Sequence, residues 1–294
     1  MTAHAAEPGA IAASAVAAPA LARRPGIRTV YRWELRKLAA QKRTYIGLGC
    51  AMLVPLIFVI SLLADDDGPE GIPFGDYVRE SGLAIPLVGL FFGAFWFFPL
   101  VTALVAGDIV ANEDGNGTLK TILTRSVDRW QIFVAKALAA FTYAFAALVI
   151  YVGVGLALGG VIWGFDPLMS LSGNLISLER SLLLVAGTTL VYFLPTLAVA
   201  SLALLLSTTT RNSAAAVVAT LMLSLIMQLL GIISALDFVR PYLLPTQFNA
   251  WQGLLREPID WAPVIRAAWV SAVFGLPALF WALTAFLRRD VTGG

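Results

Sequence analysis

Long apolar runs alternate with short charged segments along most of the chain. A helix needs about 20 apolar residues to cross the ~30 Å hydrocarbon core of a bilayer. Six runs are long enough, and we expect each to form one transmembrane helix. They are Tyr45–Ala64, Leu83–Ala111, Ile132–Val161, Leu182–Ser207, Ser213–Leu236 and Pro263–Leu287. Because open sheet edges are not tolerated in lipid, the pattern predicts an all-α polytopic membrane protein.

Several runs exceed the minimum length, so we expect tilted helices or helices that extend beyond the bilayer. Prolines within the runs predict kinks, which neighbouring helices can accommodate. These prolines are Pro55, Pro86, Pro99, Pro195 and Pro277. The four-residue spacing of the pairs Gly89/Gly93 and Gly155/Gly159 predicts close helix packing.

The segment 27–44 precedes the first run and has a helical period. Its apolar face comprises Ile27, Val30, Tyr31, Leu35 and Leu38, and its basic stripe comprises Arg28, Arg32, Arg36 and Arg43. This pattern predicts an amphipathic interfacial helix on anionic headgroups. Glu34 falls on the apolar side, where a carboxylate is costly unless it is paired. Lys37, Lys42 or a partner protein could neutralise it, and the sequence leaves these alternatives open.

Composition agrees with the membrane class. Of 294 residues, 59% are hydrophobic and 13% are charged, against roughly 25% charged in a soluble domain. The net charge of +2 and the clustering of basic residues fit membrane topology better than a phosphate-binding surface. We therefore expect no nucleic-acid partner.

The distribution of lysine and arginine predicts the orientation. One set of alternating connections holds fourteen of these residues and the other holds four. The first set is Arg23, Arg24, Arg28, Arg32, Arg36, Lys37, Lys42, Arg43, Lys120, Arg125, Arg129, Arg211, Arg288 and Arg289; the second is Arg79, Arg180, Arg240 and Arg256. We therefore expect both termini in the cytosol of a multi-pass protein of the cell membrane, of bacterial type.

The chain divides into an Ala-rich segment, 1–26, and one membrane domain, 27–290. The first segment carries Glu7 and no early basic residue, whereas a secretory signal has basic residues ahead of its apolar part. We expect a disordered cytosolic tail there.

Several classes of membrane enzyme lack their essential groups in this sequence. The only cysteine is Cys50 and the only histidine is His4, so a Cys/His metal site and a His-assisted nucleophile are excluded. No G-x-x-x-x-G-K-[ST] motif occurs, so the chain has no nucleotide-binding loop of that kind. We expect no enzyme activity and no metal or cofactor bound by this chain.

The connection 112–131, between the second and third apolar runs, is rich in charged residues. We expect a short helix over Thr118–Thr124 with Glu113 and Asp114 just ahead of its N-terminus. Ser126 is the expected N-cap of the following helix. Such a helix–turn–helix is either a solvated connector or a docking surface for a cytosolic partner.

Two segments resemble the type-2 permease family of ATP-binding-cassette transporters. They are YRWELRKLAAQKR before the first run and EDGNGTLKTILTRSVDRWQIFVAK between the second and third. The matching positions are Glu113, Gly117, Thr118, Leu119, Leu123, Arg129 and Lys136. Ser126 and Asp128 depart from the family pattern, which has proline and serine there.

The resemblance implies the membrane subunit of an ATP-driven exporter. Such a permease pairs with a second copy or a homologous permease, and it binds a separate cytosolic ATPase that carries ATP and magnesium. The implied docking residues are Glu34, Arg36, Glu113, Gly117, Thr118, Leu119, Leu123, Arg125 and Arg129. The alternative is a non-transporting scaffold or immunity protein that recruits a cytosolic partner through the same loop.

The resemblance also implies where a substrate would pass. In the family the second and fifth spans face the dimer axis, which assigns an apolar path to Phe91, Phe95, Trp96, Met222, Met227 and Gln228. Helix packing alone would also explain these side chains. The outer segment 237–262 is either an interfacial helix or a re-entrant segment. We expect no buried ion pair in any span, which speaks against a proton-driven carrier and favours an amphiphilic or apolar cargo.

Overall fold

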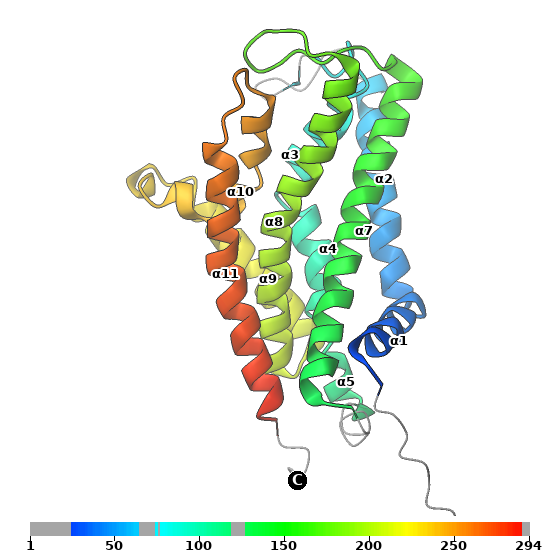
Figure 1. The fold of residues 1–294 in the computed structure, drawn as a ribbon, viewed down its shortest axis with the longest axis vertical. Coiled ribbons are helices and arrows are strands. Elements are labelled where there is room, and N and C mark those ends of the chain that lie inside the picture. Colours follow the sequence, from blue (N-terminus) through cyan, green and yellow to red (C-terminus); the bar gives the residue numbers. More distant parts are fainter. Residues whose placement is uncertain (1–24, 65–73, 76, 119–126, 290–294) are drawn as a thin grey trace, which may run out of the picture.

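The computed structural model describes residues 25–64, 74–75, 77–118 and 127–289 (Figure 1). Within these ranges the chain is helical and contains no β-strand, apart from one isolated bridge between Met169 and Leu175. The predicted all-α class is therefore confirmed for the described residues.

Within the described residues, five helices are long and apolar enough to cross a membrane. They are α2 (Lys42–Ala64), α7 (Arg129–Trp163), α8 (Leu178–Thr210), α9 (Ser213–Leu230) and α11 (Ala262–Leu287). They lie side by side in one bundle (Figure 1). At 1.5 Å per residue, the 35 residues of α7 span about 50 Å, so this helix extends well beyond a hydrocarbon core.

The second apolar run is not one continuous helix. It forms α3 (Ala84–Gly93) and α4 (Phe97–Ala106), and the chain bends by 64° between them. Pro99 explains the bend, because proline has no N–H to donate to the carbonyl four residues earlier, and its ring clashes with that carbonyl. That carbonyl belongs to Phe95, at the bend itself.

The fifth run is shorter than predicted, since α9 ends at Leu230 and not at Leu236. The chain then forms short turns: η1 (Ser234–Leu236), η2 (Arg240–Tyr242), α10 (Leu244–Gln247) and η3 (Ala250–Leu255). The part between α9 and α10 projects sideways from the bundle, below its upper end (Figure 1). The following part packs against α8 and α11, where the apolar side chains of Phe248, Trp251, Leu254 and Leu255 are buried.

The upper part of the bundle is held by a close approach of two backbones. A Cβ atom on Gly159 of α7 would lie 2.2 Å from the Gly82 carbonyl oxygen, so a side chain does not fit there. The prediction that Gly155 and Gly159 mark close packing is confirmed at Gly159. At Gly155 a Cβ atom would lie 3.4 Å from Pro86, an ordinary contact distance.

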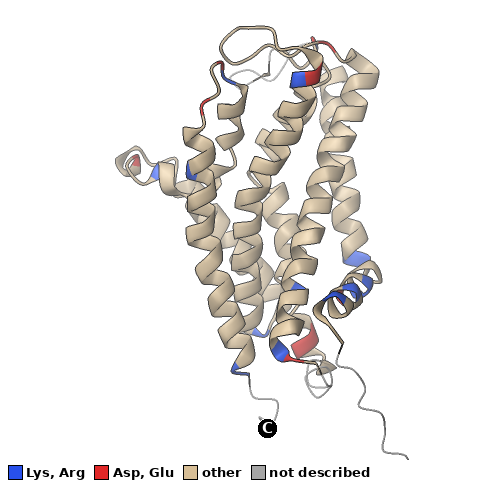
Figure 2. Cartoon of the chain, viewed as in Figure 1, with Lys and Arg blue, Asp and Glu red and all other residues tan. Residues whose placement is uncertain are grey.

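Charged residues gather at the two ends of the bundle and are sparse between them (Figure 2). At the lower end lie α1 (Ile27–Ala39), α5 (Ala111–Gly115) and the end of α11. The buried residues of α1 are Val30, Glu34 and Leu38, whereas Arg28, Arg32 and Arg36 are exposed. An amphipathic helix with Glu34 on its apolar side is therefore confirmed over Ile27–Ala39, whereas residues 42–44 of the predicted segment 27–44 belong to α2.

Candidate functional site

Four alternating charges from three elements meet at the lower end of the bundle. Glu34 and Lys37 come from α1, Glu113 from α5 and Lys136 from α7. Lys37 Nζ lies 2.7 Å from Glu34 Oε1 and 2.8 Å from Glu113 Oε1. Lys136 Nζ lies 3.1 Å from Glu34 Oε2 and 2.7 Å from Glu113 Oε2. Each carboxylate thus contacts both lysines, and these four residues are the four-charge cluster.

The cluster is largely shielded from solvent. The Lys136 side chain is fully buried, and those of Glu34, Glu113 and Lys37 are 4%, 16% and 39% exposed. Lys136 also donates a hydrogen bond to the Ile109 carbonyl at 3.3 Å, whereas its contact with Glu113 Oε2 is an ion pair without hydrogen-bond geometry. Two positive and two negative charges compensate one another, which is what makes their burial tolerable.

Lys37 lies outside the membrane-length helices. Burial by itself lowers the pKa of Lys37, but the carboxylates of Glu34 and Glu113 outweigh this effect and raise the pKa above its ordinary value of 10.5. Lys37 is therefore charged throughout the neutral pH range and holds both acids.

Two further acids connect the same short segment, 107–116, to other helices. Asp108 contacts Arg43 at the start of α2 and Ser213 at the start of α9. Asp114 lies 3.0 Å from the Arg289 guanidinium, just beyond the end of α11. Together with the four-charge cluster, these contacts join the segment to α1, α2, α7, α9 and the end of α11. A displacement of 107–116 would therefore act on most of the bundle.

The predicted docking residues that the structure describes occupy several kinds of position. Arg36 is exposed on α1, while Glu34 and Glu113 belong to the four-charge cluster. Arg129 donates hydrogen bonds to the carbonyls of Leu287 at 3.2 Å and Arg289 at 2.8 Å, so it holds the end of α11. Leu119, Leu123 and Arg125 lie outside the described residues.

The local structure of this loop differs from the expectation. Glu113 and Asp114 lie within α5 and not ahead of a helix, and most of the expected helix Thr118–Thr124 lies outside the described residues. Gly117 has φ +69°, a left-handed conformation that favours glycine. The N-cap prediction is wrong, because α7 begins at Arg129 and its N-cap is Asp128 rather than Ser126. Serine and aspartate are both good N-cap residues, so the sequence did not discriminate between them.

Gln228 Nε2 donates a hydrogen bond of 2.7 Å to the Phe95 carbonyl. This is the carbonyl that loses its helical donor because residue 99 is proline. The bend between α3 and α4 is therefore held by a side chain of α9.

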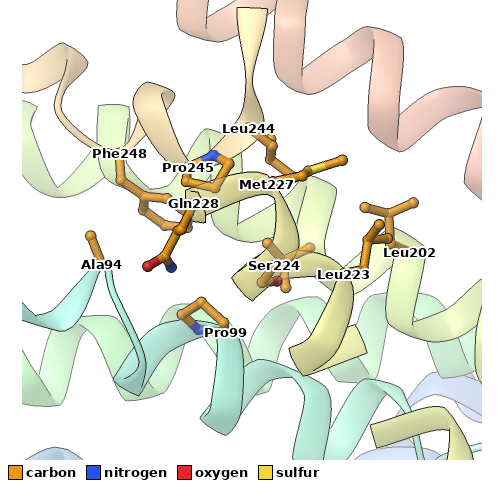
Figure 3. Close-up of a pocket in the computed structure, with 11 residues that line it drawn as sticks. Ala94, Pro99, Leu202, Leu223, Ser224, Met227, Gln228, Leu244, Pro245 and Phe248 are labelled. Atoms are coloured by element: carbon orange, nitrogen blue, oxygen red, sulfur yellow. The ribbon is translucent and has the colours of Figure 1, made fainter. Parts of the chain in front are cut away.

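The structure brings together part of the predicted substrate path at this bend. Phe95, Met227 and Gln228 line a crevice of about 290 Å³. A small void of about 10 Å³ adjoins it between α4, α8, α9 and α10, and Gln228 and Met227 line both (Figure 3). The Phe91 ring lies edge-on to the Phe95 ring, with centroids 5.8 Å apart.

Two predicted path residues lie elsewhere. Trp96 and Met222 are exposed on the outside of the bundle and line neither the crevice nor the void. On α9, Met222 belongs to an exposed apolar stripe with helical spacing. The stripe comprises Val218, Met222, Ile226 and Leu229.

The sequence profile of a family described as "Protein of unknown function (DUF2705)" matches residues 48–292. The match covers most of the chain. The chain belongs to this family. No curated protein matches the chain in a sequence comparison.

The matched part of this DUF2705 chain includes Asp108, Glu113, Lys136 and Arg289, whereas α1 with Glu34 and Lys37 precedes it. The expectation that no span contains a buried ion pair is wrong, because Lys136 of α7 and Asp108 beyond α4 are both buried and paired. The signal in the sequence was an isolated charge within an apolar run.

Of the alternatives for neutralising Glu34 in this DUF2705 chain, the pairing with Lys37 is confirmed. Lys42 has no ion pair with Glu34 in the described structure. The second partner, Lys136, is 102 residues away along the chain and was not predicted.

Proposed function

We propose that this DUF2705 chain is the permease subunit of an ATP-driven exporter of the ATP-binding-cassette type. In this proposal it spans the cell membrane six times with cytosolic termini, and a separate cytosolic ATPase binds ATP and magnesium. The observation that carries the proposal is the four-charge cluster. The cluster links α1 to α7 and to α5, which lies at the start of the loop 112–131. The resemblance to the permease family assigns the ATPase contact to α1 and to this loop.

Coupling requires that a movement of the ATPase at the cytosolic surface displaces the membrane-embedded helices. Because Glu113 contacts lysines of both α1 and α7, the two surface segments and a helix of about 50 Å would move as one body. The additional contacts of Asp108 and Asp114 support transmission to α2, α9 and α11.

Six spans follow if α3 and α4, with the segment as far as Gly115, form one bent span, since this pair passes the length and hydropathy criteria together. An even number of spans agrees with the position of α1 and the end of α11 at the same end of the bundle (Figure 1). The larger share of lysine and arginine in the connections at that end favours a cytosolic location.

Interaction with a second copy or a homologous permease is supported by the exposed stripe of α9 and the exposed Phe95 and Trp96. All of these are apolar, and they lie on the second and fifth runs, which face the dimer axis in the family that the sequence resembles. Lipid would cover the remaining apolar surface, including that of α2.

The proposal is tested by purifying the tagged chain in mild detergent from its native host, with ATP and magnesium present, and identifying co-purifying proteins by mass spectrometry. We expect a stoichiometric ATP-binding-cassette ATPase. Arg36→Glu should reduce its recovery about tenfold or more, because this exposed residue would change from an attractive to a repulsive contact.

The matched control is Arg256→Glu, which reverses the charge of an exposed arginine in the outer segment. It should leave ATPase recovery unchanged. If the wild-type chain is recovered alone, the permease proposal fails and a scaffold that recruits another partner takes its place.

A further inference from the structure

The crevice at the α3–α4 bend has a mixed lining. Apolar side chains from α9 and the turn after it, Met227, Leu229 and Ile232, lie along one part. Arg240 and Asn249, from the segment around α10, contribute polar groups. Its volume of about 290 Å³ is close to the lower limit for small-molecule sites, roughly 300 Å³.

Among the residues that the structure describes, Arg240 is the only charged one that lines this crevice. In the described structure its guanidinium has neither an ion pair nor a hydrogen bond to protein, and no carboxylate lines the crevice. Asp237, three residues earlier, is exposed and does not pair with it within the described residues. By contrast, Arg180 and Arg256, which also lie in the outer connections, pair with Glu257 at 2.8 Å and Asp260 at 3.6 Å.

The surroundings of Arg240 combine a charge with exposed apolar side chains. The segment with Arg240 leaves the bundle below its upper end, beside α11 (Figure 1). Its neighbours Ile232 and Phe238 are large apolar side chains that are mostly exposed. Arg240 is itself exposed, and a cation that is accessible at a membrane surface attracts anionic groups of ligands or lipids.

A second polar group at the same place also lacks a partner. Asn249 Oδ1 is buried and accepts no hydrogen bond in the described structure. A buried amide oxygen without a donor is unfavourable. A ligand that supplies both an oxyanion for Arg240 and a proton donor for Asn249 would satisfy both groups.

We propose that this crevice is a binding site for an amphiphile with an alkyl tail and a phosphate head group that also carries a hydroxyl proton donor. Arg240 binds the oxyanion through charge-assisted hydrogen bonds, which guanidinium forms well with such groups. Met227, Leu229 and Ile232 contact the tail. The crevice lies at the bend, among residues of the predicted substrate path. We therefore propose that an amphiphile of this class is the transported cargo. The cargo role rests on the proposed function, whereas the binding site does not.

Binding is measured on the purified chain without any ATPase, so that failure of this proposal and failure of the permease proposal are distinguishable. The probe is monododecyl phosphate, added to the chain in a neutral maltoside detergent and counted by native mass spectrometry. We expect one saturable site per chain. Dodecyltrimethylammonium, with the same tail and a cationic head, should not occupy it.

Arg240→Gln should weaken binding of monododecyl phosphate about tenfold to a hundredfold, the range for loss of a charged hydrogen-bond donor. Arg256→Gln is the matched control, since it removes a charge from the same outer segment without touching the crevice, and it should bind like wild type. Arg240→Lys retains the charge and should recover part of the affinity. Equal affinity of Arg240→Gln and wild type would overturn the proposal.

The same head-group chemistry could come from an anionic membrane lipid or from a separate amphiphile. Competition with phosphatidylglycerol distinguishes these sources, with phosphatidylcholine as the neutral comparison. Displacement by phosphatidylglycerol alone identifies a membrane lipid as the occupant. Binding that resists both lipids identifies a single-chain amphiphile.

Discussion

Lys136 is the only charged residue between Ile132 and Trp163 of α7, and its side chain is fully buried. Its environment explains why it is tolerated there: Glu34 and Glu113 lie within 3.1 Å and 2.7 Å of its Nζ. In an apolar helix the ordinary expectation is that such a lysine reaches toward the headgroups. Here it reaches a pair of carboxylates from two other elements instead.

Replacing this lysine should therefore be severe. Within the described part of the chain, Lys136→Met leaves Glu34 and Glu113 with Lys37 as their only cation, and loss of one partner of a buried ion pair destabilises by about 3–5 kcal/mol. Adding Glu113→Gln restores neutrality and should recover a large part of that loss. Thermal unfolding in detergent measures both variants.

The matched control is Arg288→Met, which removes an exposed cation from the same end of the bundle. It should unfold close to the wild-type temperature. If Lys136→Met were as stable as this control, the buried charges would not be coupled as the geometry indicates.

At the scale of an element, the bend between α3 and α4 has two causes that lie far apart in sequence. Pro99 removes the N–H that would have bonded to the Phe95 carbonyl, and Gln228 of α9 replaces that donor. Tyr151 of α7 and Tyr192 of α8 donate hydrogen bonds to the Gly89 and Leu90 carbonyls of α3, at 2.7 Å and 3.0 Å. The broken span is thus supported by three neighbouring helices.

This arrangement predicts a coupling between Gln228 and Pro99. Gln228→Leu leaves the Phe95 carbonyl without this donor and, because the hydrogen bond is exposed, should destabilise by about 0.5–1.5 kcal/mol. In a Pro99→Ala background the restored N–H of residue 99 can take over, so the same replacement should cost clearly less. A double-mutant cycle from unfolding temperatures measures the difference. An equal loss in both backgrounds would contradict the role assigned to Pro99.

At the scale of the whole molecule, the apolar surface is not evenly distributed. The bundle leaves α9 with little buried surface, and the stripe Val218, Met222, Ile226 and Leu229 faces outward on it. In the proposed permease this stripe would contact a second copy.

The proposed interface can be tested by cross-linking. In a Cys50→Ser background, Met222→Cys should give dimers with a short bifunctional thiol reagent in native membranes. Leu53→Cys on α2 is the control, because its parent residue is similarly exposed, 52% against 49% for Met222, but lies outside the proposed interface. Efficient cross-linking of Leu53→Cys and none of Met222→Cys would place the contact elsewhere.

The sequence by itself determined the helical membrane class and the positions of most long helices. The reason is that each apolar side chain avoids water and each backbone polar group in lipid needs a hydrogen bond. A run of about 20 apolar residues therefore forms a helix that is buried or faces lipid. The amphipathic helix over Ile27–Ala39 and the position of Glu34 on its apolar side followed from the helical periodicity, although the predicted segment extended to residue 44.

The tertiary structure alone decided which distant residues meet. Glu34 pairs with Lys136 across 102 positions and Gln228 reaches Phe95 across 133, and no local pattern encodes such a contact. The charges in the connection 112–131 and in α1 were visible in the sequence, but their arrangement into one compensated cluster depends on how three elements pack. The tertiary structure also showed that no described carboxylate lies beside Arg240 in the crevice.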